Sequence, residues 1–273
     1  MVITLGNIVF GGKGNGGGAP AAYVVPDGMN FGYTSLTEFP FDDFDFSQKT
    51  NFSYCWYSCS NLTEFPALDL SGGTNFKYAW YNCKALTEFP QLNVSNGTDF
   101  SFAWSNCSSL TKFPMLDLSA GTDFSYAWAE CKSLKEFPQL DLSSGTNFNR
   151  AWYNCQSLKE FPQLDLSSGT NFSWAWCNCI ILTTIPQLDL SAATDLSDAW
   201  FYCSYLTNLG GFGAISVSFS LSTCTSLTVD SIMNVINQAA TVTGKTMTFG
   251  SYNLNKLTDE QKAVATNKGW TLA

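Results

Sequence analysis

Apolar residues recur along most of the chain with a period of 24 residues. Tryptophan and cysteine each hold one phase of this pattern over seven consecutive copies. The tryptophans are Trp56, Trp80, Trp104, Trp128, Trp152, Trp176 and Trp200, and the cysteines are Cys59, Cys83, Cys107, Cys131, Cys155, Cys179 and Cys203. Residue types that stay in register over this length indicate an internal structural repeat, which takes precedence over any local pattern.

The first half of each repeat predicts a short helix. Phe76, Ala79, Trp80 and Cys83 follow the spacing i, i+3, i+4 and i+7, which places them on one helical face. Thr74 is a suitable N-cap residue before them. A helix of about two to three turns is unstable alone in water. We therefore expect it to pack against its neighbours in the next copies.

The second half of each repeat predicts a short strand. Leu86, Phe89, Leu92 and Val94 are apolar, and the last two alternate with polar residues as on a half-buried strand. Pro90 lies among them and cannot donate a backbone hydrogen bond to a neighbouring strand. The paired segment therefore lies on one side of the proline, and the pattern leaves open which side.

A single repeat cannot bury its own apolar face, whereas stacked repeats can. Strands stacked about 4.8 Å apart over roughly eight turns would give a rod on the order of 40 Å long. Its interior would consist of ladders of identical residues. The sequence therefore predicts an α/β solenoid with 24-residue turns, each with a short strand and a short helix.

The repeat resembles a known family. The segments L-x-x-F-P-x-L-D-L-S and F-x-x-A-W-x-N-C are similar to the BspA-like leucine-rich repeats, and still closer to relatives in mycoplasmal surface lipoproteins. The resemblance covers roughly residues 33–228, and residues 229–273 look like the ending found on such repeats in gut-bacterial and phage-encoded proteins. It implies a leucine-rich repeat fold and a surface or virion recognition protein rather than an enzyme.

The resulting domain division has three parts: residues 1–32, the repeat region 33–228 and a small α/β C-terminal cap at 229–273. In the cap we expect helices from Val229 to Ala240 and from Thr258 onwards, and short strands at 246–249 and 270–272. Thr258 and Gln261 have the spacing of a capping box.

The N-terminal part predicts one strand from Val2 to Phe10, followed by a flexible glycine-rich linker from Gly11 to Gly18. One interpretation is an anchor, in which residues 1–18 attach the rod to a virion or cell-surface protein. The other is a poorly ordered terminus. The first residues lack the basic start and the unbroken apolar run of a secretory signal.

Composition narrows the function classes. The net charge of −9 disfavours nucleic acid and anionic lipid as partners. The absence of histidine removes Ser-His-Asp and Cys-His catalysis. No apolar stretch approaches the roughly 20 residues of a membrane-spanning helix. We expect no enzymatic activity, no cofactor, no bound metal and no membrane insertion.

Two repeated polar features have a functional and a structural interpretation each. The cysteines could form disulfides or bind zinc through Cys55 with Cys59 or Cys177 with Cys179, but their phase favours free, buried thiols. The second feature is a column of aspartates that could bind cations or could accept backbone N–H groups in turns. Asn93 occupies the same column and can accept an N–H equally well, which favours the turns. Its acidic members are Asp69, Asp117, Asp141, Asp165 and Asp189.

The outer face of the predicted helix carries the candidate binding residues. Aromatic side chains in two repeated columns would form a stripe that stacks on sugars or anchors a protein, unless neighbouring turns cover the rings as packing. Arg150 and Asp198 interrupt these columns. The candidates are Tyr78, Tyr81, Phe102, Tyr126, Tyr153, Trp174, Phe201 and Tyr202.

Three functions follow in order of preference. The first is a phage virion or tail protein that mediates host attachment by contacting a protein or a surface glycan. The second is a BspA-like adhesin on the bacterial cell surface. The third is a glycan-active enzyme, which a repeated column of carboxylates without a unique pair disfavours. A homo-oligomer is compatible with the first function, by analogy with virion fibres.

Overall fold

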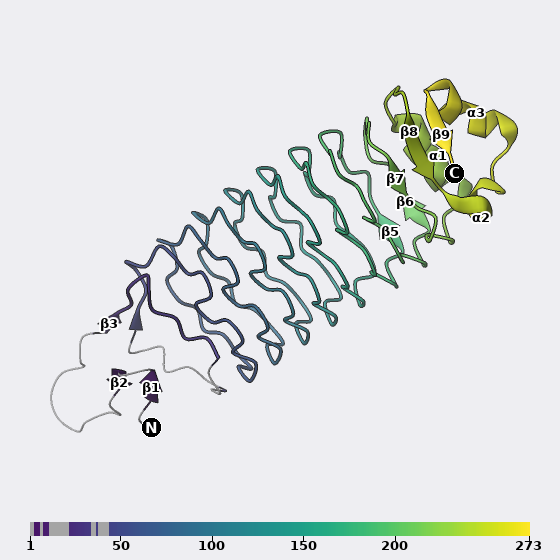
Figure 1. Cartoon of the computed structure of the whole chain (residues 1–273). Coiled ribbons are helices and arrows are strands. Elements are labelled where there is room, and N and C mark those ends of the chain that lie inside the picture. Colours follow the sequence, from purple (N-terminus) through teal and green to yellow (C-terminus); the bar gives the residue numbers. More distant parts are fainter. Residues whose placement is uncertain (1–2, 6–7, 11–21, 34–36, 38–43) are drawn as a thin grey trace.

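The computed structural model describes residues 3–5, 8–10, 22–33, 37 and 44–273. The chain forms an elongated stack of similar coils, with the amino terminus at one end and the helices of the C-terminal segment at the other (Figure 1). Parallel bridges join residues one repeat apart, such as Asn75 with Asp99 and Asp99 with Asp123. Each coil is therefore hydrogen bonded to the next along the axis of the rod.

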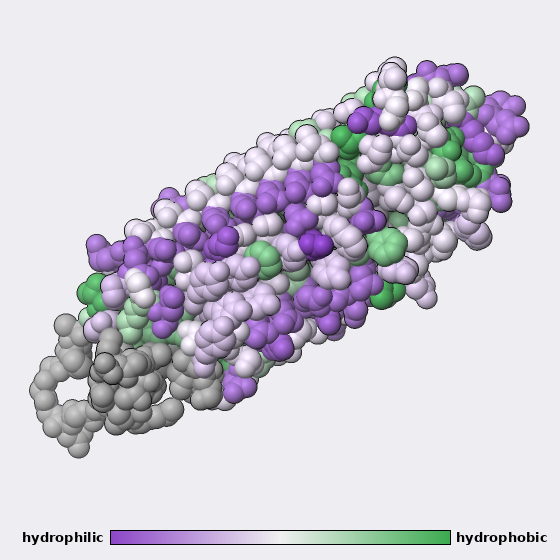
Figure 2. Space-filling view, in the orientation of Figure 1, coloured by the Kyte–Doolittle hydropathy of each residue, from purple (hydrophilic) through white to green (hydrophobic). Residues whose placement is uncertain are grey.

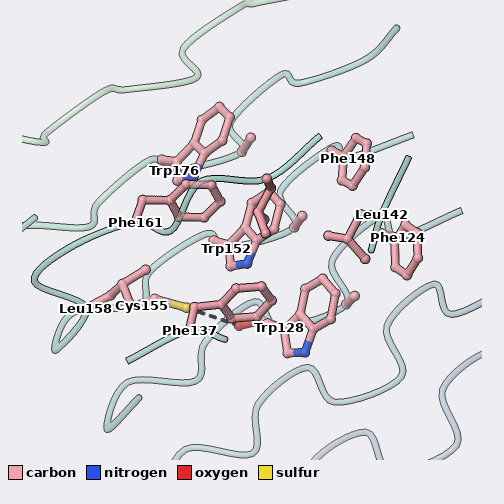
Figure 3. Close-up of a cluster of buried hydrophobic side chains, with 14 of the residues drawn as sticks. Phe124, Trp128, Phe137, Leu142, Phe148, Trp152, Cys155, Leu158, Phe161 and Trp176 are labelled. Carbon is pink, nitrogen blue, oxygen red and sulfur yellow. Dashed lines mark hydrogen bonds between the residues drawn. The ribbon is translucent and has the colours of Figure 1, made fainter. Parts of the chain in front are cut away.

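The core is a set of ladders inside this stack. Indole rings of consecutive coils lie nearly parallel, with centroids 5.3–5.7 Å apart. Phe137 and Phe161 stand almost perpendicular to Trp128 and Trp152, at 4.8 Å in each pair (Figure 3). The repeated tryptophans are fully buried, and their N–H groups have no hydrogen-bond acceptor among the described residues. Ring packing therefore holds this column.

The segment predicted to be a helix is a series of tight turns, so that prediction was wrong. Tyr78 and Asn82 have φ angles of 56° and 63°, which no α-helix contains. The N–H groups of Ala79 and Cys83 donate to carbonyls three residues earlier, at 3.0 and 3.3 Å. Those of Tyr78 and Asn82 donate to the next coil, at 2.9 and 2.8 Å.

Hydrogen bonding between coils explains this difference. In a helix the N–H groups are used within the segment, whereas the turns direct every second N–H to the adjacent coil. The apolar spacing of Phe76, Ala79, Trp80 and Cys83 still places all four in the core, because each is fully buried. The same spacing of apolar residues is therefore compatible with both an α-helix and the observed series of turns.

Strand pairing in the other half lies on the N-terminal side of the prolines. Lys112 bridges Glu136, and Glu160 bridges Thr184, each pair just before its proline. Beyond the prolines, side chains take over part of this role. Nε2 of Gln139 donates to the carbonyl of Gln163 at 3.0 Å. A glutamine amide thus links the coils beyond Pro138, whereas beyond Pro186 backbone bonds resume, and the N–H of Leu188 donates to the carbonyl of Gly211 at 3.1 Å.

The strands are short and the helices are confined to the C-terminal segment of the described chain. β3 pairs with β4, β5 with β6, β7 with β8, and β8 with β9, all in parallel. From residue 22 onwards the strands are β3 (Tyr23–Val24), β4 (Phe44–Asp45), β5 (Thr184–Ile185), β6 (Asn208–Leu209), β7 (Phe219–Ser220), β8 (Lys245–Thr248) and β9 (Trp270–Leu272), and the helices are α1 (Val229–Gln238), α2 (Gly250–Leu254) and α3 (Asp259–Asn267).

Most elements of the C-terminal segment were predicted. α1 begins at the expected residue, although it ends at Gln238 rather than Ala240. The capping box of Thr258 and Gln261 at the start of α3 is confirmed. The short helix α2 was not predicted. Because β7 already pairs with β8, the terminal sheet begins inside the last coil, and one hydrophobic core continues from the coils into α1.

The amino-terminal prediction of a single strand was wrong. β1 (Ile3–Leu5) and β2 (Ile8–Phe10) pair antiparallel, with Ile3 opposite Phe10. Gly11–Gly18, the predicted linker, lies outside the described residues. In the first described coils, Lys49 is fully buried and donates from Nζ to the carbonyls of Pro26 and Asp27 at 2.9 and 2.8 Å.

Candidate recognition surface

The candidate aromatic residues occupy three columns of the rod rather than two. The first column contains Tyr78, Phe102, Tyr126 and Trp174, and the second contains the candidates that lie three positions later in their turns. Tyr202 belongs to a third column, in which the preceding coil places Asn178. All eight candidates are at least partly exposed. The face of the rod in Figure 2 shows rows of hydrophilic side chains that run along its axis.

Neighbouring rings in the first column lie against one another. Tyr78 and Phe102 have centroids 4.4 Å apart and planes 11° apart. Phe102 and Tyr126 have centroids 4.2 Å apart and planes 12° apart. Each interior ring therefore has both faces covered by its neighbours. Ring edges and tyrosine hydroxyls remain for solvent or a partner.

Three tyrosines that the sequence reasoning missed extend both columns. Tyr54 stacks on Tyr78 at 4.8 Å, and Tyr57 stacks on Tyr81 at 4.9 Å. Tyr33 adds a tilted ring at 5.1 Å from Tyr57 and is 78% exposed. The signal was present, because these residues lie 24 or 48 positions before members of the predicted columns. We define the aromatic surface as Tyr33, Tyr54, Tyr57, Tyr78, Tyr81, Phe102 and Tyr126.

The backbone fixes the direction of these side chains. Tyr78, Phe102 and Tyr126 have φ angles of 56°, 59° and 57°, in the left-handed region that bulky residues rarely adopt. Their N–H groups are bonded to the next coil, so the strain persists because the stack holds it. Burial raises the pKa of Tyr78, and charge repulsion from Tyr54 adds to the increase. Its hydroxyl is therefore neutral at physiological pH.

The remaining candidates lie towards the C-terminal end of the rod. Arg150 replaces an aromatic residue in the first column, and its guanidinium lies over the rings of Tyr126 and Trp174. Trp174 meets Phe201 edge to face at 6.2 Å, and Phe201 lies 4.1 Å from Tyr202. The structure thus places Trp174, Phe201 and Tyr202 together, apart from the continuous stack of the aromatic surface.

The acidic column has the geometry of Asx turns. Oδ1 of Asp141 accepts the N–H of Ser143 at 3.0 Å and its hydroxyl at 2.7 Å. Asn93 makes the same two contacts with Ser95. The hydroxyl and then the N–H of Ser143 lower the pKa of Asp141. These bonds favour the turn interpretation over cation binding.

We expect Asp141→Ala to destabilise the protein by about 1 kcal/mol at pH 7, because two hydrogen bonds are lost. Asp141→Asn keeps the acceptor and should change stability by less than roughly half that amount. The lowered pKa means that the carboxylate's contribution is present above its unfolded pKa and is lost as pH falls through the folded value. Denaturation midpoints at pH 7 and 3 test this, and equal losses in both variants at pH 7 would contradict it.

The ten cysteines are free and buried. Sγ of Cys155 donates to the carbonyl of Trp128 at 3.2 Å (Figure 3). Other thiols of its column make the same contact, such as Cys107 with Trp80 and Cys179 with Trp152. Burial raises the pKa of Cys107 and of Cys179 to about 12. In the described part of the chain, no three His, Cys, Asp or Glu side chains are grouped to hold a metal ion.

We expect these thiols to be unreactive in the folded protein, because a thiol reacts as its exposed thiolate. An aromatic disulfide reagent at pH 8 should label less than about one thiol per native chain and all ten after unfolding. Rapid labelling of several thiols under native conditions would show that the coils open locally.

A separate hollow of about 780 Å³ lies over the strand half of three coils. Lys135 and Lys159 line it together with Glu136 and Glu160, and Phe161 contributes to its wall. None of the predicted aromatic candidates borders it. Its charged residues belong to repeated columns, so the hollow contains no acidic pair that differs from the rest of the rod.

No family model matches the chain, and the search of curated proteins found no match. In the described ranges, none of the helices has the length and apolar character needed to cross a bilayer.

Proposed function

We propose that the protein is a non-enzymatic recognition protein that binds a protein partner through the aromatic surface. The observation that carries this proposal is the continuous stack of Tyr54, Tyr78, Phe102 and Tyr126, with ring centroids 4.2–4.8 Å apart. Stacking and the fixed backbone hold the rings before any partner arrives. Binding therefore requires little further loss of side-chain entropy.

A protein partner fits the exposed parts of the rings better than a sugar. Stacking on a sugar requires an open ring face, and neighbouring rings cover both faces of Tyr78 and Phe102. Ring edges and hydroxyls contact protein surfaces well, which is one reason why tyrosine is frequent in binding sites for proteins. The proposed setting is a virion or a bacterial cell surface, and this part of the proposal depends on the family resemblance.

Cell binding tests the proposal. Labelled protein is added to a panel of intact bacteria, to the same cells after surface proteolysis, and to an immobilised glycan panel. We expect binding to intact cells, at least tenfold weaker binding after proteolysis, and no saturable binding to the glycans. Tyr78→Ala with Tyr126→Ala should reduce cell binding at least tenfold, whereas Tyr252→Ala, which removes a 62% exposed tyrosine elsewhere, should not.

Thermal unfolding of each variant shows whether the coils remain folded. Cell binding that survives surface proteolysis, together with saturable binding to a glycan on the panel, would show that the partner is a sugar rather than a protein. Equal loss of binding in the double variant and in Tyr252→Ala would exclude the aromatic surface as the contact.

A further inference from the structure

Arg150 is the single arginine of the chain and replaces an aromatic residue in the first column. Its guanidinium carbon lies 5.2 Å from the ring centroid of Tyr126 and 5.2 Å from that of Trp174. Nη1 also donates to the hydroxyl of Tyr126. Two cation–π contacts and one hydrogen bond therefore hold this side chain in one position.

The backbone adds to this restraint. Arg150 has a φ angle of 54°, and its N–H donates to the carbonyl of Ser173 at 2.9 Å. A guanidinium has five N–H donors in a planar fork. Among the described residues, only one N–H group of the Arg150 guanidinium has a protein acceptor. The others remain for a ligand at the surface, since Arg150 is partly exposed.

Among the described residues, Arg150 has no carboxylate partner, although the chain has 22 acidic residues. The ion pairs between described side chains are Lys132 with Glu130 at 3.1 Å and Lys262 with Asp259 at 3.7 Å. Oε2 of Glu130, which pairs with Lys132, also accepts from Nδ2 of Asn154 at 2.7 Å, so these two neighbours hold that carboxylate. Asp198 lies two coils beyond Arg150 in the same column, about 10 Å away at roughly 4.8 Å per coil.

We propose that Arg150 binds a carboxylate group of the protein partner. The inference rests on the proposed function and names the chemistry of one contact within it. A planar guanidinium matches a carboxylate through two parallel N–H···O bonds. The rings of Tyr126 and Trp174 limit access of water to the guanidinium, and the hydrogen bond to the hydroxyl of Tyr126 restrains it further. Tryptophan, tyrosine and arginine are also the residues that most often dominate protein interfaces.

The single arginine permits a direct test. Protein labelled with ¹⁵N-arginine gives one side-chain Nε signal by NMR, which can be followed during titration with N-acetyl-aspartate amide. We expect a saturable shift of this signal. The neutral isostere N-acetyl-asparagine amide should bind at least tenfold more weakly. Trp174→Ala keeps the signal but removes one ring, and it should weaken aspartate binding at least fivefold.

Two further titrations identify the source of the anion. Glucuronate and inorganic sulfate are added separately, and we expect each to require at least a fivefold higher concentration than the aspartate amide. Tighter binding of either would overturn the assignment to a protein carboxylate. Equal shifts with the aspartate and asparagine amides, or no saturable shift with aspartate, would overturn the carboxylate site altogether.

Failure of this inference is distinguishable from failure of the proposed function. Arg150→Gln in the cell-binding assay should reduce binding at least fivefold, and unchanged binding would overturn the role of Arg150 while the aromatic surface stands. If wild-type protein binds no cells but the NMR titration saturates with aspartate, the proposed function fails and the carboxylate site stands.

Discussion

Raising the pH from 8 to 10 is expected to unfold the protein. Burial raises the pKa of nine described thiols in the folded state. For Cys107, Cys179 and Cys224 it raises the pKa to about 12. The unfolded chain releases these protons near the ordinary thiol pKa. The stability supplied by neutral thiols is therefore complete below about pH 8.5 and is lost as pH rises towards the folded values.

The expected effect is large because the thiols act together. Each thiol lowers the free energy of unfolding by about 1.4 kcal/mol per pH unit between its unfolded and folded pKa values, so nine lower it by about 13 kcal/mol per unit. This is comparable to the whole stability of a typical domain, roughly 5–15 kcal/mol. Urea midpoints at half-unit steps of pH, with reductant present, measure the slope.

Cys131→Ala provides the control. It should lower the stability at pH 7, because it removes a buried side chain, but it should also reduce the alkaline slope by about one proton. A urea midpoint that stays constant between pH 8 and 10 would show that the thiols titrate normally in the folded protein.

Gly145→Ala is expected to lower the free energy of unfolding by about 1–3 kcal/mol, as overpacking does in a dense core. A Cβ atom at residue 145 would lie 2.4 Å from Cζ of Phe148 and 3.0 Å from the carbonyl oxygen of Leu142. Phe148 is fully buried in its ladder and cannot move aside. The chain itself shows the compensation, because Ala193 and Leu196 occupy the same two columns two coils later.

The double variant Gly145→Ala with Phe148→Leu should therefore be more stable than the sum of the single changes predicts, by about 1 kcal/mol. Gly28→Ala is the matched control, because no atom lies within 4 Å of its added Cβ. Chemical denaturation of the wild type, of Gly145→Ala, of Phe148→Leu and of the double variant gives the coupling free energy between the two positions. Strict additivity would show that ring size and the glycine are independent.

Residue patterns predicted the side chains of this rod better than its backbone. The period predicted which residues line the core, and Trp80 and Cys83 are buried as expected. The capping box at Thr258 was also recognisable, since its hydrogen bonds form within one segment. The turns at Tyr78 and Asn82 were not, because their N–H groups are satisfied by another coil. Local spacing contains no information about that partner.

The candidate surface was predicted in part for the same reason. The aromatic columns could be found from the period, yet the covered faces of Phe102 depend on ring contacts between coils. Arg150 was noticed only as an interruption of a column. Its significance follows from its contacts with two rings and from its lack of a carboxylate partner in the part of the chain that the structure describes.

Because each coil bonds to its immediate neighbours, the gene could gain or lose one 24-residue unit without creating a new kind of junction. Such an in-frame duplication on the N-terminal side of Tyr126 would lengthen the rod by about 4.8 Å. It would leave Tyr126, Arg150 and Trp174 in the same mutual arrangement. Selection could therefore tune the reach of the protein and the chemistry of its binding site as separate heritable traits.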